Sequence, residues 1–336
     1  MPDDTTDVRA DALQMSRDLV AMIDSEGDQM TDATAPQAAE PATEDKELPE
    51  SPYAFGALAE KALDDIEEIG SRKRPEAING LRGIQTGFTD LDALMGGLTA
   101  GTLTVIASRP AMGRTTLACD FARHAAIKCQ QPTGFLTMQE PLTRAVTRIK
   151  AAECRIARHR IHSGTMTDDD WKRLARRMPA LAASPLYIRP MSNPGLVSLI
   201  FEMKEWAQAD KLALLVIDGI EEIGVGLDKQ ADPVTVVREL KALADELGIP
   251  IVVTAHVHNT AARRLGRVPH LDDVDDAVTF AADTVLLVHR EDAYHQNSPR
   301  AGEADLIVAK HRNGPTATIT TAFQGHYSRF VDMAQT

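Results

Sequence analysis

Residues 103–126 have the sequence LTVIASRPAMGRTTLACDFARHAA, in which an apolar segment passes through a short loop into a helical pattern. The apolar part is typical of a strand buried on both faces. From Arg114 onward, apolar residues recur at helical spacing. A buried strand that turns directly into a helix is the first half of a β–α–β unit, so this stretch predicts an α/β fold built on a parallel sheet.

The rest of the chain from about residue 84 repeats this alternation. Apolar, β-prone segments predict strands at 102–107, 134–138, 186–189, 212–217, 249–255, 284–289, 304–309 and 316–322. Helical patterns lie between the earlier ones, at 115–128, 142–158, 168–178, 194–209 and 234–247. The last strands follow one another without helices. We therefore expect a mainly parallel twisted sheet flanked by helices, with an antiparallel extension at its C-terminal end.

The loop between strand and helix resembles a phosphate-binding loop of the pattern G-x-x-x-x-G-K-[ST]. The corresponding residues here are Ser108, Gly113, Arg114 and Thr115. Backbone N–H groups of such a loop converge on phosphate oxygens, and the helix dipole adds to the attraction. The residues predicted to contact the nucleotide are Ser108, Arg109, Pro110, Ala111, Met112, Gly113, Arg114, Thr115, Thr116 and Asp218.

Thr115 and Asp218 are the predicted magnesium residues. The Thr115 hydroxyl occupies the position that coordinates Mg²⁺ in a P-loop. Asp218 ends the apolar strand 212–217, and an aspartate at this place in P-loop proteins orients the metal through water. The expected cofactors are therefore ATP and Mg²⁺. A carboxylate that merely caps a turn is the alternative for Asp218.

Arg114 departs from the pattern, which has lysine at this position. A guanidinium is bulkier and planar, so it cannot take the place of a compact ammonium between the β and γ phosphates. We expect nucleotide binding to survive this change and the alignment for phosphoryl transfer to suffer.

The acidic character of the chain lies mostly in its first 50 residues. The net charge is −13, and residues 1–50 contain 14 acidic and 3 basic residues. Residues 1–52 are predicted to be an acidic, mostly disordered tail, with a short helix compatible with the apolar spacing at 13–23, and its partner is unknown. Residues 53–74 are predicted to form a linker helix with one apolar stripe, and 75–336 the ATPase-like domain.

Composition also bears on the compartment. No apolar run approaches the roughly 20 residues that span a bilayer. The beginning of the chain, MPDDTTDVRA, has neither a basic nor an apolar region of a signal peptide. The three cysteines have no CxxC spacing. We expect a cytoplasmic protein without a membrane partner.

Several segments together resemble the C-terminal motor domain of DnaB-type replicative DNA helicases, a RecA-like family of P-loop ATPases. They are 83–92 (GIQTGFTDLD), 109–113 (RPAMG), 164–171 (GTMTDDDW), 240–250 (LKALADELGIP), 310–315 (KHRNGP) and 327–330 (YSRF). The resemblance covers about residues 83–332. The linker helix lies where the family has its own, whereas the family's globular N-terminal domain, which contacts primase, has no counterpart.

The resemblance implies a homo-oligomeric ring, a hexamer in the family's manner, that hydrolyses ATP at subunit interfaces and moves along single-stranded DNA. Lys310 and Arg312 match the basic pair that reaches the neighbour's nucleotide. There they would stabilise charge on the γ-phosphoryl group, as an arginine finger does. Two solvated charges on a strand edge are the alternative.

Two further positions depart from what the resemblance implies for catalysis. The family's general base, a glutamate at the end of the second strand, falls on Gln139, and an amide cannot take a proton from water. Glu140 is the next residue, but successive side chains of a strand point to opposite faces of the sheet, so Glu140 would point away from the base position. His256 lies where the family usually has a glutamine that senses the γ-phosphate.

The loops that contact DNA in the family are altered as well. A basic cluster of Arg263, Arg264 and Arg267 suits the phosphates of single-stranded DNA, and an ordinary solvated loop is the alternative. The next segment, 271–277, contains four aspartates, which would repel DNA at a pore.

Two functions of different classes follow. The first is a DnaB-like ATP-binding DNA helicase domain that acts in DNA replication, with attenuated hydrolysis. The second is a catalytically degenerate RecA-like nucleotide-binding protein with a regulatory or interaction role. Arg114, Gln139 and the aspartate-rich segment favour the second, and the breadth of the resemblance favours the first. A RecA-like recombination ATPase is a third hypothesis, which fits the 310–315 motif less well.

Overall fold

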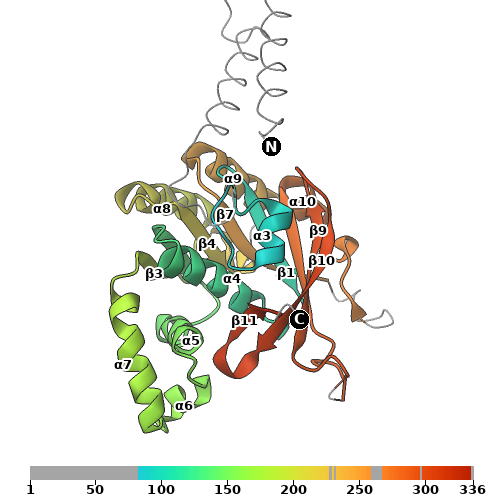
Figure 1. Cartoon of the computed structure of the whole chain (residues 1–336). Coiled ribbons are helices and arrows are strands. Elements are labelled where there is room, and N and C mark those ends of the chain that lie inside the picture. The colour runs from blue at the N-terminus through green and yellow to red at the C-terminus, as the bar shows by residue number, and fades with distance from the viewer. Residues whose placement is uncertain (1–81, 227–228, 231, 259–266, 296, 334–336) are drawn as a thin grey trace, which may run out of the picture. The chain divides into compact units, whose positions relative to one another are not determined.

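The computed structural model describes residues 82–333 with the exception of 227–228, 231, 259–266 and 296. The predicted tail 1–52 and linker helix 53–74 lie outside the described residues, as do Arg263 and Arg264. Figure 1 shows a twisted sheet through the middle of the domain with helices on both faces.

Nine strands form the main sheet, in the order β11-β10-β9-β8-β1-β7-β4-β2-β3. Six neighbouring strands, from β8 to β3 in this order, are parallel. They are β1 (Leu103–Ser108), β2 (Thr133–Thr137), β3 (Leu186–Pro190), β4 (Leu214–Asp218), β7 (Ile251–His256) and β8 (Thr284–His289). The antiparallel extension is β9 (Glu303–His311), β10 (Ala317–Gln324) and β11 (Arg329–Asp332). The predicted sheet and its antiparallel end are confirmed.

The helices lie in two layers, because strand residues alternate between the two faces of the sheet. On β1, Val105 packs into one core cluster and Ile106 into the other. The first cluster lies under α8 (Leu196–Ala209), α9 (Pro233–Leu247) and α10 (Asp276–Ala281). The second lies under α3 (Thr89–Met95) and α4 (Arg114–Arg123), and α4 continues as the π-helix η2 (His124–Lys128).

Shorter elements complete the domain. The segment between β2 and β3 contains α5 (Leu142–Cys154), α6 (Arg158–Ser163) and α7 (Asp168–Ala182). Three 3₁₀ turns, η3 (Ile220–Glu222), η6 (Leu271–Asp273) and η7 (Gly325–Tyr327), and the small hairpin β5 (Gly224–Gly226) and β6 (Lys229–Gln230) occupy loops.

The predicted helix 142–158 is divided in two. Arg155 has φ 52° and caps α5, because a left-handed residue ends the helical hydrogen-bonding pattern. The chain then turns and restarts as α6. This break has a functional consequence, since it turns Arg158 and His159 toward the cavity described below.

Candidate nucleotide site

The loop 109–113 leaves the end of the central strand β1 and enters α4. Two of its residues have positive φ, Ala111 at 66° and Gly113 at 110°. Such a curl at a helix N-terminus is typical of an anion-binding concavity, in which free backbone N–H groups face the anion. A Cβ on Gly113 would lie 2.7 Å from Phe330 Cζ, so the position requires glycine for its conformation and for space.

A cavity of about 900 Å³ opens over this loop. Eight of the predicted nucleotide residues line it, together with Gln139 and His256, and they are Ser108, Arg109, Pro110, Ala111, Gly113, Arg114, Thr115 and Thr116. Met112 does not, because its side chain is buried in the core cluster under α4. Asp218, Glu140, Lys310, Arg312 and Arg267 are not among the lining residues either.

Asp218 lies directly beneath the cavity at the end of β4 and is fully buried. Its Oδ1 accepts hydrogen bonds from Thr115 Oγ1 at 2.9 Å and from Thr254 Oγ1 at 2.8 Å. Its Oδ2 is buried with no hydrogen-bond partner among the described residues. Burial raises the pKa of this carboxyl, while the two hydroxyls and Arg114 act in the opposite direction.

This arrangement fits a magnesium ion. Mg²⁺ takes hard oxygen ligands, keeps several waters and binds through one or two protein groups plus phosphates. The unsatisfied Oδ2 of Asp218 is an acceptor for such a water, and the Thr115 hydroxyl lies beside it. A buried acceptor without a partner is costly unless a ligand completes it.

The side chain of Arg114 contacts both the end of β7 and the loop that follows β2. Its guanidinium donates to Gln139 Oε1 at 3.1 Å and to Ala255 O at 3.3 Å, and it contacts His256 Nε2. Burial lowers the pKa of Arg114, opposed by Glu221 and by other nearby carboxylates. Burial also lowers the pKa of His256, which favours a neutral imidazole that accepts from the guanidinium.

Glu140 is held by an ion pair. Arg148 on α5 donates to it twice, Nε to Oε1 at 3.1 Å and Nη2 to Oε2 at 2.8 Å, and both side chains are largely buried. Arg148 also donates from Nη1 to Thr116 Oγ1 at 3.2 Å. The carboxylate that lies next to the expected base position therefore has both oxygens occupied by one guanidinium.

The cavity also has lining residues that the sequence analysis did not assign to the site, among them Arg148, Arg158, His159 and His326. With Arg109, Arg114 and His256, they make a lining rich in cations and imidazoles, to which Glu222 adds a carboxylate. Arg148 could have been suspected from its place on the predicted helix 142–158. Arg158 and His159 could not, because their direction depends on the break at Arg155.

Comparisons with known proteins identify the family of this chain. The family model described as DnaB-like helicase C terminal domain matches residues 83–332. The chain belongs to this family. The replicative DNA helicase DnaB of Leifsonia xyli subsp. xyli is 38% identical over 282 residues, which cover 82% of this chain and 61% of that protein. The replicative DNA helicase DnaC of Bacillus subtilis is 28% identical over 279 residues, covering 81% and 60%. The chain thus spans about 60% of the length of these curated relatives.

Solved structures show the same fold. A solved ATPase domain superposes with a TM-score of 0.73 at 22% identity, over 82% of this chain and 98% of that one. A DnaB-like replicative helicase, studied with its interactions with primase, superposes with a TM-score of 0.71 at 22% identity, over 82% and 66%. The predicted RecA-like core is confirmed.

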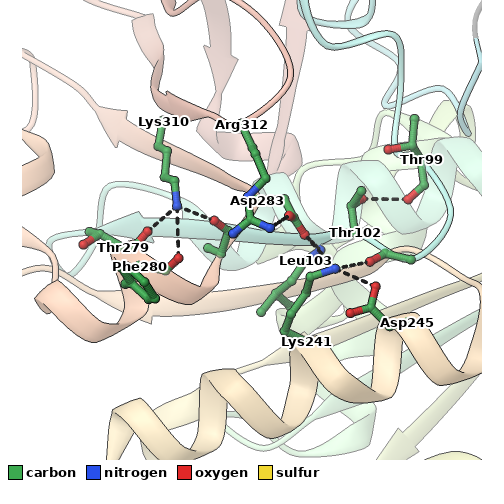
Figure 2. A network of polar contacts seen from close by, with 12 residues as sticks. Thr99, Thr102, Leu103, Lys241, Asp245, Thr279, Phe280, Asp283, Lys310 and Arg312 are labelled. Carbon is green, nitrogen blue, oxygen red and sulfur yellow. Dashed lines mark hydrogen bonds and ion pairs between the residues drawn. The ribbon is translucent and has the colours of Figure 1, made fainter. Parts of the chain in front are cut away.

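Lys310 and Arg312 of this DnaB-like domain lie far along the sheet from the cavity. The residue Lys310 pairs with Val285 near the start of β8, whereas the phosphate loop follows the end of the parallel neighbour β1. Its Nζ donates to the carbonyls of Thr279 (2.5 Å), Phe280 (3.3 Å) and Ala282 (2.7 Å) at the end of α10. Arg312 forms an ion pair with Asp283 at 3.0 Å (Figure 2). Neither side chain approaches the cavity of its own chain.

Of the basic cluster expected to contact DNA, Arg267 is described. Its side chain is exposed, and its guanidinium stacks on the Tyr294 ring, 4.7 Å from the centroid. The Tyr294 hydroxyl accepts a hydrogen bond from Arg109 Nη1 of the phosphate loop at 3.3 Å. The ring of Tyr294 therefore lies between a residue of the expected DNA loop and a residue of the candidate nucleotide site.

No helix in the described part of the chain is long and apolar enough to cross a membrane.

Proposed function

We propose that this DnaB-like domain binds ATP with Mg²⁺ and works as the motor of a DNA helicase in replication, with attenuated hydrolysis. The observation that supports nucleotide binding is the cavity over the phosphate loop, which is lined by Thr115 and several cationic side chains. Asp218 lies beneath it, in contact with Thr115. A triphosphate supplies the anionic oxygens that such a lining attracts.

The roles of the protein groups follow from their positions. Backbone N–H groups of Ala111, Gly113 and the first turn of α4 would hold the phosphates, because Pro110 has no N–H and that of Met112 donates to Arg109 O. Arg114 would add a positive charge. Thr115 and Asp218 would hold the magnesium ion, which neutralises charge that develops on the phosphates. The predicted finger residues Lys310 and Arg312 are remote from their own cavity, so they would complete the site of a neighbouring copy in a ring.

The weak point of the proposed reaction is removal of a proton from the attacking water. Gln139 has no basic oxygen for this task. Glu140 has a carboxylate, but Arg148 occupies both of its oxygens. Because loss of one catalytic contact costs on the order of 10² to 10³ in rate, we expect turnover well below that of an ordinary motor domain.

Single-stranded DNA is the proposed track. Arg267 offers an exposed guanidinium, and phosphate contacts of this kind are salt-dependent. We expect binding of a labelled single-stranded oligonucleotide to weaken as salt rises, and Arg267→Ala to reduce that dependence. Binding with no salt dependence at all would contradict a phosphate track.

The second candidate, a nucleotide-binding regulatory or interaction protein, is favoured by one observation. Both side chains that could serve at the base position have other partners: Gln139 contacts Arg114 and Glu140 contacts Arg148. A site of this kind would hold ATP without consuming it.

Two measurements separate the candidates. Calorimetry with ATP and ADP in the presence of Mg²⁺ tests nucleotide binding, and absence of affinity at millimolar ligand would overturn both. Phosphate release with and without single-stranded DNA then tests the motor. Turnover stimulated by DNA supports the helicase, whereas binding without turnover above background supports the regulatory protein.

A further inference from the structure

Arg114 contacts two other residues that depart from the family's expected pattern. Arg114 stands where the P-loop pattern has lysine, Gln139 at the expected base position, and His256 at the expected sensor position. The guanidinium of Arg114 is the centre of this group, with hydrogen-bonding contacts to both of the others. The three positions come from α4, β7 and the loop after β2, so their contact is tertiary and not a result of sequence proximity.

The carboxylates of Glu221, Asp218 and Glu222 lie near the Arg114 guanidinium and act to raise its pKa, but the described groups that accept its hydrogen bonds are uncharged. They are the amide oxygen of Gln139, the carbonyl oxygen of Ala255 and the imidazole of His256. Hydrogen bonds to neutral acceptors satisfy the donors of a cation and leave its charge in place. Arg114 is 7% exposed, and a buried charge gains strongly from an anion that reaches it. The anion that the neighbouring phosphate loop would bring is the nucleotide phosphate.

The side chain of Gln139 is exposed, and its amide oxygen is directed to Arg114. Its side chain lies across Gly219, where a Cβ would be 2.6 Å from Gln139 Cγ and 3.0 Å from Nε2. Gly219 has φ 106°, a conformation that suits glycine. Because residue 219 has no side chain, the Gln139 amide can lie against its backbone. The amide oxygen then accepts from the Arg114 guanidinium.

We propose that Gln139 is a positioning residue for Arg114, and that the two bind the nucleotide phosphates as a matched pair. The inference rests on the proposed function, because it assigns the pair to the same nucleotide site. A glutamate at position 139 would form a charge-assisted ion pair with the guanidinium in place of a neutral hydrogen bond. That ion pair would compete with the phosphates for the cation. An arginine at position 114 thus requires a neutral amide as its partner. Gln139 has this role in addition to replacing the glutamate that the family uses as its base.

The test is a double-mutant cycle on ATP affinity in the full chain. Calorimetry with Mg²⁺ and ATP gives the Kd of wild type, Arg114→Lys, Gln139→Glu and the double variant. We expect Gln139→Glu to weaken ATP binding roughly tenfold beside Arg114, as one charge-assisted hydrogen bond is redirected. In the Arg114→Lys background the same change should cost less than roughly threefold, since contacting residues couple whereas separate ones add.

Simple repulsion between the new carboxylate and the phosphates predicts a different result. It would weaken binding by the same factor in both backgrounds, and such additivity overturns the inference. Gln208→Glu on α8 is the matched control, because it adds the same charge on an exposed helix position outside the cavity. It should leave the Kd unchanged.

Gln139→Ala provides a second cycle without any new charge. It should weaken ATP binding beside Arg114, because the guanidinium loses its support, and should have little effect in the Arg114→Lys background. Thermal melts without nucleotide show whether each variant is folded. Wild type that binds no ATP would remove the proposed function, and with it this inference. Wild type that binds, with either cycle additive, overturns the matched pair alone.

Discussion

Thr115 and Asp218 are joined by a hydrogen bond from Oγ1 to Oδ1 over 2.9 Å, although 103 positions separate them in the sequence. The bond connects the first turn of α4 with the end of β4, two strands away from β1 in the sheet. It thereby places the two predicted magnesium residues side by side under the cavity.

Asp218→Asn should therefore separate binding from folding. We expect Mg²⁺-dependent ATP affinity to fall at least roughly tenfold, because an amide is a poor substitute for a carboxylate near the metal. Stability should hold or rise at pH 7, since burial raises the pKa of Asp218 and a neutral side chain avoids that cost. Calorimetry with Mg²⁺ and with a chelator, beside a thermal melt, measures both. Unchanged Mg²⁺-dependent affinity would refute the metal role.

The fold was largely predictable because buried parallel strands are continuous apolar runs. All eight predicted strands occur, with ends shifted by a few residues, as for the predicted 249–255 and the observed β7. The strand Arg329–Asp332 was missed, since four residues give too little periodicity. The division of the predicted helix 142–158 was also missed. Arg155 adopts a left-handed conformation there, and arginine gives no signal for such a conformation in the sequence.

The site was predictable where chemistry is local and unpredictable where it depends on tertiary contact. The loop 109–113 and Asp218 could be found from strand ends. The pairing of Glu140 with Arg148 and of Gln139 with Arg114 could not, because each joins residues from different elements. These pairings decide what the departures from the family pattern mean chemically.

Gly113→Ala tests the shape of the phosphate loop. A left-handed φ of 110° and a Cβ at 2.7 Å from Phe330 both oppose a methyl group here. We expect a loss of about 2–3 kcal/mol in the free energy of unfolding. Gly164→Ala is the matched control, with φ 71° and nothing within 4 Å of its Cβ, and should cost about 1 kcal/mol. Urea unfolding compares the two. Equal losses would show that the contact with Phe330 does not limit the loop.

His124 should make the domain sensitive to mild acid. Burial, with Arg123 and Lys128 nearby, lowers its pKa to about 4. Between pH 6.5 and 4, His124 is protonated in the unfolded chain and neutral in the folded chain. The free energy of unfolding therefore falls as the pH falls through this window. With allowance for partial exposure, the loss is about 1–2 kcal/mol.

His124→Gln should remove this part of the acid sensitivity. The measurement is the difference in melting temperature between the variant and wild type from about pH 7 to about pH 4. Asp120, whose pKa burial raises to about 6, acts in the opposite direction, but it is present in both proteins and cancels in the difference. A difference that does not change with pH would contradict the depressed pKa of His124.

Arg312 offers the sharpest test of a ring, because it lies away from its own cavity and its side chain is 49% exposed. Arg312→Ala should cost little stability, since it loses one partly exposed ion pair with Asp283. The change at Lys310 would cost more, because three carbonyls lose their donor. If Arg312 acts on the neighbour's nucleotide, its loss should reduce single-turnover hydrolysis by roughly 10³-fold or more. Mixing Arg312→Ala subunits with Asp218→Asn subunits, each inactive alone, should restore part of that activity, because some interfaces combine an intact Asp218 with an intact Arg312. A mixture as inactive as its components would show that Arg312 does not complete a neighbour's site.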